Sequence, residues 1–226
     1  MGFINDLLSL IFPRNCEACS NLLYEHEKFI CNQCEINLSD SIKNYQQQVN
    51  HVFAGRVPVV HMLCKYVFMK DGKTQKLLHA IKYQGQKDLA EYIGKLFAAQ
   101  FKEELSEIDL IVPIPLHEKK LKKRGFNQSA CFAQGIHNLS QISIDNQSLL
   151  RAINTDTQTK KAKYERWQNV EGIFLLHNPT FFENKHILLV DDVITTGATI
   201  EAAWLVFKDI KGIKISIGSI AYAAKN

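Results

Sequence analysis

The feature that most constrains the fold is the run ILLVDDVITTGAT at residues 187–199. Its first four aliphatic residues, 187–190, predict a buried strand of a parallel sheet. Two adjacent acids, Asp191 and Asp192, follow where we expect that strand to end, and a loop of small residues then leads into an amphipathic helix. Because ligands of open α/β sheets bind at the carboxyl ends of strands, we expect a binding site here.

The loop after the two acids is suited to a phosphate group. Its candidate contacts are Thr195, Thr196, Gly197, Ala198 and Thr199. A helix N-terminus behind such a loop presents backbone N–H groups and the positive end of the helix dipole to an anion. The chain contains neither GxxxxGK[ST] nor GxGxxG, which argues against a P-loop nucleotide site and a Rossmann dinucleotide site.

The acid pair adds a preference for a sugar. Successive side chains of a strand point to opposite faces, so Asp191 and Asp192 can share one ligand only if the strand ends before them. Hydrogen bonds to a charged group contribute roughly 1.5–3 kcal/mol each. Two carboxylates that hold ribose hydroxyls or a divalent metal would therefore select a ribose phosphate over bare phosphate. The competing interpretation is a buried strand followed by an ordinary Asp-rich turn.

A second signal is a pair of CxxC motifs near the N-terminus. The pairs are Cys16 with Cys19 and Cys31 with Cys34, and eleven residues separate them. Two such knuckles typically make a tetrahedral four-thiolate site for zinc, which has no open position and is therefore structural. An iron site and disulfides are the alternatives. Free thiolates imply a reducing compartment, hence the cytoplasm.

Composition and patterning place the chain among globular α/β proteins. It has 226 residues, a formal net charge of +4 and no apolar run near the roughly 20 residues that span a bilayer. Alternating strands and helices predict a mostly parallel sheet flanked by helices. We expect a helix and zinc module at 1–50 and the α/β domain at 51–226, with a polar linker at 41–56. Expected helices cover 73–84, 88–105 and 127–139, and expected strands lie within 57–68, 108–114, 187–190 and 213–221.

A second anion-binding loop is expected after the strand that ends near residue 114. Prolines stop that strand, and cations follow at Lys119, Lys120, Lys122, Lys123 and Arg124. Arg124 is the candidate ligand for pyrophosphate because guanidinium matches phosphate oxygens bidentately, with Asn127 and Gln128 as polar partners. The lysines are interpreted as steering charges or a nucleic-acid contact. A solvated basic turn is the alternative.

The polar segment 155–170 is a candidate flap over a charged transition state. Its candidate contacts are Gln158, Lys160, Arg166 and Asn169. An exposed helix and loop with no ligand contact is an equally weighted interpretation of any one of them.

Taken in order, the motifs resemble one family. They are CxxC…CxxC, Ile-Lys-Tyr at 81–83, PIPL…RGFNQ at 113–128, Gln158…Arg166…Asn169 and LLVDDVITTGAT at 188–199. The chain is similar over nearly its whole length to the ComF (GntX-like) family. The resemblance implies a type I phosphoribosyltransferase fold with an N-terminal zinc module, and phosphoribosyl pyrophosphate with Mg²⁺ as ligands. It also marks Lys82 as a site residue and implies, in some bacteria, a role in DNA uptake beside a helicase-like partner.

Two functions remain open at this point. In an enzyme, a nitrogen nucleophile would attack the anomeric carbon, the two acids would stabilise an oxocarbenium-like transition state, and Arg124 with Mg²⁺ would neutralise the leaving pyrophosphate. In a non-catalytic module, the fold would serve as a ligand-binding or single-stranded-DNA-binding component of an uptake system. No residue pattern identifies the nucleophile or the oligomeric state.

Overall fold

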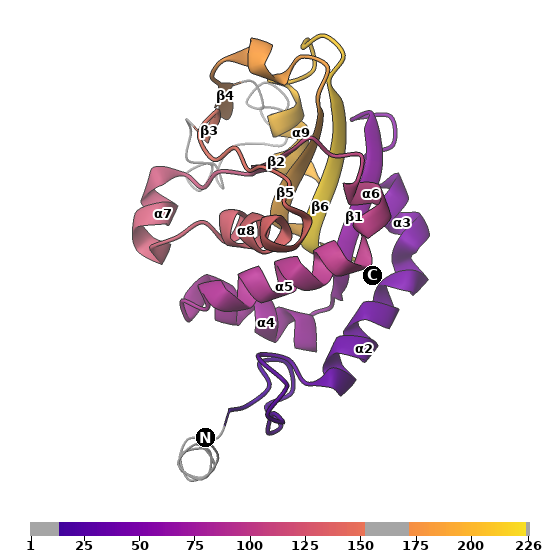
Figure 1. The fold of residues 1–226 in the computed structure, drawn as a ribbon, viewed down its shortest axis with the longest axis vertical. Coiled ribbons are helices and arrows are strands. Elements are labelled where there is room, and N and C mark those ends of the chain that lie inside the picture. Colours follow the sequence, from indigo (N-terminus) through magenta and orange to yellow (C-terminus); the bar gives the residue numbers. More distant parts are fainter. Residues whose placement is uncertain (1–13, 152–171, 225–226) are drawn as a thin grey trace, which may run out of the picture.

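The computed structural model describes residues 14–151 and 172–224, in which helices and strands alternate (Figure 1). The helices are α2 (Asn32–Ser41), η1 (Ile42–Tyr45), α3 (Gln46–His51), α4 (Lys73–Tyr83), α5 (Lys87–Gln100), α6 (Lys102–Leu105), α7 (Glu118–Arg124), α8 (Gln128–Ser140), η3 (Pro179–Phe182) and α9 (Ala198–Trp204). The strands are β1 (Val59–Phe68), β2 (Leu110–Pro113), β3 (Leu149–Arg151), β4 (Phe174–Leu176), β5 (His186–Ile194) and β6 (Lys214–Ala223).

Within the described residues, the main sheet has four strands in the order β1-β6-β5-β2, and every neighbouring pair is parallel. Leu189 of β5 is paired with Ile217 of β6 on one side and with Val112 of β2 on the other. A parallel bridge from Ile111 to Ile144 extends the edge beyond β2. The predicted parallel α/β sheet is confirmed, and the carboxyl ends of its strands lie at one edge.

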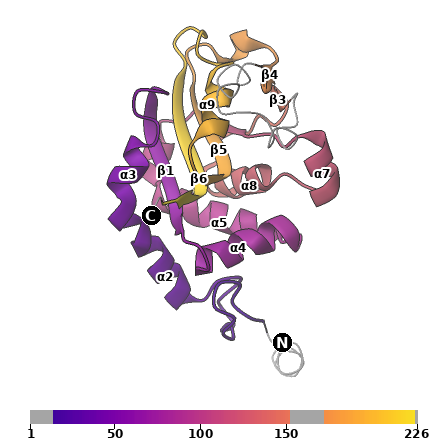
Figure 2. The same ribbon diagram turned by 180° about the vertical axis from the view of Figure 1, so that it is seen from behind.

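Helices cover both faces of this sheet. Helices α4, α5 and α8 lie on the face toward the viewer in Figure 1, where their apolar residues pack with Leu188 and Val190 of β5. Helix α9 lies on the opposite face, seen from behind in Figure 2, and packs with Ile187 and Leu189 of β5. These four residues of β5 are fully buried, as expected of a central parallel strand.

Helices α5 and α8 approach closely because glycines face each other. A Cβ atom on Gly94 would lie 2.3 Å from the carbonyl oxygen of Phe132, and one on Gly135 would lie 2.0 Å from that of Glu91. The backbones therefore touch where a side chain would separate them. This contact fixes α8 on α5, beside β2 and β5.

Segment 41–56, which we expected to be a linker, is instead largely helical and packed. Ile42, Val49 and Phe53 are buried in the core beside β1. The preceding helix α2 is also anchored, because the buried Lys65 ammonium of β1 lies 3.1 Å from a carboxylate oxygen of Glu35 and donates a hydrogen bond to Ser39. Polar composition concealed this packing, since each helix buries only a narrow stripe.

Other boundaries differ from expectation by smaller amounts. The predicted helix 88–105 is broken at Phe101, whose φ and ψ of −110° and 36° are not helical. The predicted basic loop contains a short helix, α7, which His117 caps through its ring nitrogen and Gly125 ends with a left-handed φ of 81°. None of the described helices combines the length and apolar character needed to cross a membrane.

Candidate functional site

The two acids lie on β5 and meet residues from both neighbouring helices. Asp192 forms an ion pair with Lys82 at the end of α4, with Nζ and Oδ2 3.0 Å apart. Asp191 accepts a 3.1 Å hydrogen bond from the hydroxyl of Ser129, in the first turn of α8, and another from the Asp192 N–H. The resemblance marked Lys82 as a site residue, and the structure brings it to the acid pair.

The electrostatic state of Asp191 is unusual. Burial and, to a smaller extent, the neighbouring negative charge of Asp192 raise the pKa of its carboxyl to about 7. Hydrogen bonds from the Asp192 N–H and Ser129, together with the positive charge of Lys82, oppose this increase in the pKa only in part. The acid pair therefore takes up a proton easily near neutral pH and favours a cation or hydroxyl donor when that proton leaves.

Strand β5 does not end before the acids, as we had expected, but continues to Ile194. The reason is pairing with β6, in which Asp191 lies opposite Ser219 and Val193 opposite Ala221. Pairing with β6 keeps one register from His186 to Ile194. The two acids meet different helices at this edge of the sheet, because Ser129 lies in the first turn of α8 and Lys82 lies near the end of α4.

The loop after β5 places a left-handed glycine directly before the N-terminus of α9. Gly197 has a φ of 83°, and a Cβ atom at this position would lie 2.5 Å from the ring of Phe53. The Thr196 hydroxyl oxygen accepts a long hydrogen bond of 3.4 Å from the Ala198 N–H. Helix α9 begins at Ala198, so its N-terminus lies directly behind the loop.

Arg124 lies at the end of α7, where it donates a 2.9 Å hydrogen bond to the side-chain oxygen of Gln128. Its guanidinium carbon also lies 5.8 Å from the ring centroid of Tyr83. Gln128 is fully buried, and its side-chain nitrogen has no hydrogen-bond partner in the described part of the chain. A buried donor without an acceptor is costly, and here it belongs to the side chain whose oxygen orients the Arg124 guanidinium.

An open pocket of about 430 Å³, called here the basic pocket, lies between Lys82 and Arg124. It is lined by Lys82, Tyr83, Gly85, Lys120, Lys123 and Arg124. Because Lys82 also contacts Asp192, the basic pocket directly adjoins the acid pair. Cations on one side and carboxylates on the other suit a ligand that carries both phosphate groups and hydroxyls.

The structure therefore brings most of the predicted site together. The acids, the loop 195–199 and Lys82 lie around the carboxyl end of β5, and Arg124 lies across the basic pocket from Lys82. Asn127 caps α8 and donates to the carbonyl of Ile114, which makes it a structural residue of the second loop. The candidate flap residues Gln158, Lys160, Arg166 and Asn169 lie outside the described residues.

Sequence reasoning missed two contacts at the site. Ser129 follows the RGFNQ motif directly and reaches Asp191 from the first turn of α8; a small hydroxyl residue just after a helix cap was the available signal. Arg56 donates to the carbonyl of Thr196 from a turn 140 residues earlier in the chain. Nothing local in the sequence indicates that second contact.

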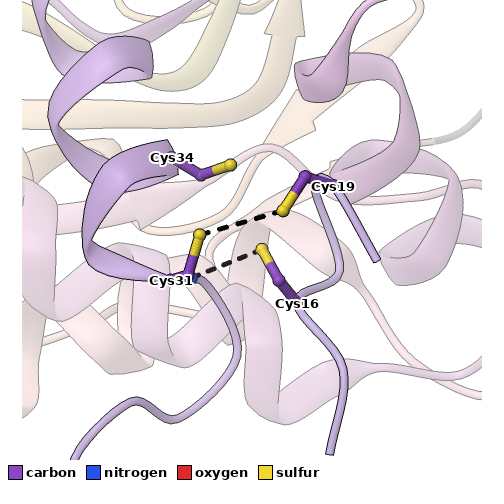
Figure 3. Close-up of side chains that lie close together, drawn as sticks. All are labelled: Cys16, Cys19, Cys31 and Cys34. Carbon is purple, nitrogen blue, oxygen red and sulfur yellow. Dashed lines mark hydrogen bonds between the residues drawn. The ribbon is translucent and has the colours of Figure 1, made fainter. Parts of the chain in front are cut away.

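The four cysteines of the CxxC pairs form a single cluster (Figure 3). All four sulfur atoms lie within 4.8 Å of one another, and those of Cys19 and Cys31 are 3.8 Å apart. A tetrahedral site with zinc–sulfur bonds of about 2.3 Å has sulfur–sulfur edges of about 3.8 Å. Cys31 also donates its backbone N–H to the sulfur of Cys16, as expected of a thiolate acceptor. The cluster therefore has the donor set and spacing for one tetrahedral metal ion.

The cysteine cluster packs against α4, the helix that carries Lys82. Cys16, Cys31 and Cys34 belong to the same buried cluster as Leu77 and Ile81 of α4. Just beyond this helix, Gln86 donates a 3.1 Å hydrogen bond to the carboxylate of Glu17. The cysteine segment thus supports α4 along its length, on the side away from β5.

Comparison with known proteins identifies relatives but no matching profile. No protein-family profile matches the chain. DNA utilization protein YhgH of Escherichia coli K12 is 30% identical over 139 residues, which cover 59% of this chain and 60% of YhgH. The matched part of this chain thus spans less than two thirds of the length of YhgH. Competence protein F of Haemophilus influenzae is 26% identical over 153 residues, 65% of this chain and 67% of that protein.

Solved structures with partial similarity include two enzymes of phosphoribosyl chemistry. Glutamine phosphoribosylpyrophosphate amidotransferase from B. subtilis has a TM-score of 0.38 at 19% identity, covering 57% of this chain and 25% of that one. Adenine phosphoribosyltransferase from Leishmania tarentolae has a TM-score of 0.40 at 10% identity, covering 63% and 74%.

A third relative aligns over most of both chains and thereby shows the family of this protein. Competence protein ComFC of Bacillus subtilis is 30% identical over 228 aligned positions, which cover 89% of this chain and 89% of that protein. An alignment of this coverage includes the basic pocket and the acid pair. The chain belongs to the ComF family of competence proteins.

Proposed function

We propose that this protein binds phosphoribosyl pyrophosphate with Mg²⁺ and transfers the phosphoribosyl group to a nitrogen nucleophile in the cytoplasm. The observation that carries the proposal is the junction of two unlike surfaces at Lys82. On one side is the acid pair with its small-residue loop, and on the other is the basic pocket with Arg124. An activated ribose has hydroxyls and a 5-phosphate for the first surface and a diphosphate for the second.

Each part of the ligand has a proposed contact. The loop 195–199 and the start of α9 would hold the 5-phosphate, and the acids would hold the ribose hydroxyls. Arg124 and Lys82, which line the basic pocket, would hold the diphosphate, and Gln128 would orient Arg124. Arg166 remains a proposed contact from the segment outside the described residues.

The chemistry follows from where the charges lie. A nitrogen lone pair would form a bond to the anomeric carbon while the bond to the diphosphate oxygen breaks, and the diphosphate takes the electron pair. Asp191 and Asp192 would stabilise positive charge that develops on the ribose, and Arg124 with Lys82 would stabilise the departing anion. The carboxylate oxygens are ligands of the hard type that Mg²⁺ prefers, and bound Mg²⁺ would neutralise charge on the diphosphate.

We further propose that the cysteine cluster holds a structural zinc ion. Four thiolates leave no position open for substrate or water, so the ion would not take part in the reaction. Its proposed role is to fold the segment 14–34, which is too short to build a core of its own, and to support α4.

Single-stranded DNA is the second candidate ligand, because lysines on α7 are exposed. Lys119, Lys122 and Lys123 all face solvent, and α7 buries none of its residues. Relatives named for DNA utilization and competence agree with a contact to DNA. A helicase-like partner remains what the family resemblance implies. Lys119 and Lys122 lie outside the lining of the basic pocket, whereas Lys123 belongs to it, so the proposed DNA contact borders the sugar site on α7.

Calorimetric titration tests the main proposal. Wild-type protein should bind phosphoribosyl pyrophosphate with Mg²⁺, and Asp192→Asn should weaken that binding at least tenfold, because a charged hydrogen-bond acceptor is lost. Asp209→Asn, an exposed site on the turn after α9, is the matched control and should bind as wild type. A wild-type protein that shows no heat of binding contradicts the proposal.

The raised pKa of Asp191 predicts a pH-dependent stability. Between about pH 4 and pH 7 the folded state holds this proton more tightly than the unfolded chain, so folding stability falls as pH rises. Asp191→Asn removes this loss and should raise the free energy of unfolding by on the order of 1–3 kcal/mol at pH 8, but little at pH 4. Urea unfolding without Mg²⁺ measures both values. An equal difference at the two pH values would refute the assignment.

Metal analysis tests the zinc proposal. The purified protein should contain one zinc per chain, and Cys34→Ala should lose it together with several kcal/mol of stability. Cys131→Ala changes a half-buried cysteine outside the cluster and should keep the metal. Iron in place of zinc, or a cluster that is oxidised to disulfides as purified, would contradict this assignment.

Replacing the exposed lysines of α7 with alanine tests the proposed DNA contact. Single-stranded DNA should bind with an affinity that falls steeply with salt, and alanine at Lys119, Lys122 and Lys123 should reduce the salt slope by up to about 3. A matched variant with alanine at Lys208, Lys211 and Lys214, also exposed, is the control for net charge. Equal binding by both variants would remove α7 from the DNA contact.

A further inference from the structure

We infer that Arg56 is a positioning residue that sets the orientation of the phosphate loop after β5, an inference that rests on the proposed function. Arg56 lies in the turn after α3, outside the elements that form the sheet. Its guanidinium donates a 3.1 Å hydrogen bond to the carbonyl oxygen of Thr196. This bond joins the N-terminal segment of the chain to the loop that the proposal assigns to the 5-phosphate.

The planarity of the peptide bond gives this contact its consequence. In a trans peptide, the carbonyl of one residue and the N–H of the next point in opposite directions. Because the Thr196 carbonyl points toward Arg56, the Gly197 N–H must point away from it. No hydrogen bond to this N–H is found within the described ranges. The Gly197 N–H is therefore a free backbone donor at the start of α9. The bond from Arg56 to the Thr196 carbonyl fixes the direction in which this N–H points.

The opposite orientation of this peptide would harm anion binding. If the unit between Thr196 and Gly197 turned over, its carbonyl oxygen would replace the N–H and repel a phosphate. Glycine at a φ of 83° has the freedom to make such a change, since it lacks a Cβ. The Arg56 bond opposes the change by giving the Thr196 carbonyl a charged partner on the far side of the loop.

Arg56 is itself held in place by three further contacts. Its guanidinium lies 2.8 Å from a carboxylate oxygen of Glu201 in α9 and donates to the carbonyl of Val52. Its guanidinium carbon also lies 5.9 Å from the ring centroid of Phe53. The Phe53 ring packs directly on Gly197, so the loop cannot retreat toward this side. One rigid planar group therefore spans the loop, the first turn of α9 and the end of α3.

The two subsites make the inference testable, because ribose 5-phosphate probes the loop and inorganic pyrophosphate probes the basic pocket. Calorimetry should show that Arg56→Ala weakens ribose 5-phosphate binding about tenfold and leaves pyrophosphate binding unchanged. Arg56→Lys should lose a similar factor, because an ammonium cannot span all the acceptors. Glu201→Gln keeps the bond to Thr196 and should change either affinity by less than threefold.

An NMR measurement distinguishes an effect of Arg56 on the orientation of the Thr196–Gly197 peptide from an effect of its positive charge alone. In protein labelled with ¹⁵N-glycine, the Gly197 amide resonance should shift strongly when ribose 5-phosphate binds to wild type, and weakly in Arg56→Lys. Wild-type affinity and a full shift in Arg56→Lys would show that only the charge matters and would overturn the inference. Equal loss of both ligands in Arg56→Ala would overturn it as well. A wild type that binds neither ligand would instead refute the proposed function.

Discussion

The pairing of β5 with a parallel strand on each side is the constraint on which the remaining structure depends. Its residues 187–190 are fully buried between two helical layers, so the position and direction of this strand are fixed by packing on both faces. The same pairing carries the strand through the acids to Ile194. The acid pair and the loop at 195–199 therefore lie at the end of a strand that is paired on both edges and packed on both faces, as a preorganised ligand site requires.

Helix α4 connects this strand to the cysteine cluster. One side of the helix packs on the cysteine segment, and Lys82 near its end contacts Asp192. Arg56 makes a comparable connection on the other face of the sheet, from the turn after α3 to the loop. Two segments that precede β1 in the chain thus support the site from opposite faces. If the site binds the proposed ligand, this arrangement gives the N-terminal segment a physical role that does not require it to touch the ligand.

The sequence was informative wherever a local pattern carried the information. The aliphatic run before Asp191 predicted the central strand, and apolar spacing located α4 and α8 to within about a residue. Asp is rare in strands, which is why the end of β5 was placed too early; its pairing with β6 overrides that propensity. The bonds from Ser129 to Asp191 and from Arg56 to Thr196 join residues 62 and 140 positions apart. Such contacts arise only from the tertiary fold and leave no periodicity to detect.

The most direct test of the central claim is ³¹P NMR of phosphoribosyl pyrophosphate and Mg²⁺ during titration with the protein. A ligand that spans the loop at 195–199 and the basic pocket around Arg124 should show changes at both its 5-phosphate and its diphosphate resonances. The account predicts that both groups of signals shift or broaden together, with one binding constant. Perturbation of the diphosphate signals alone would mean that the protein binds polyanions through its basic pocket, and would contradict a site for the activated ribose.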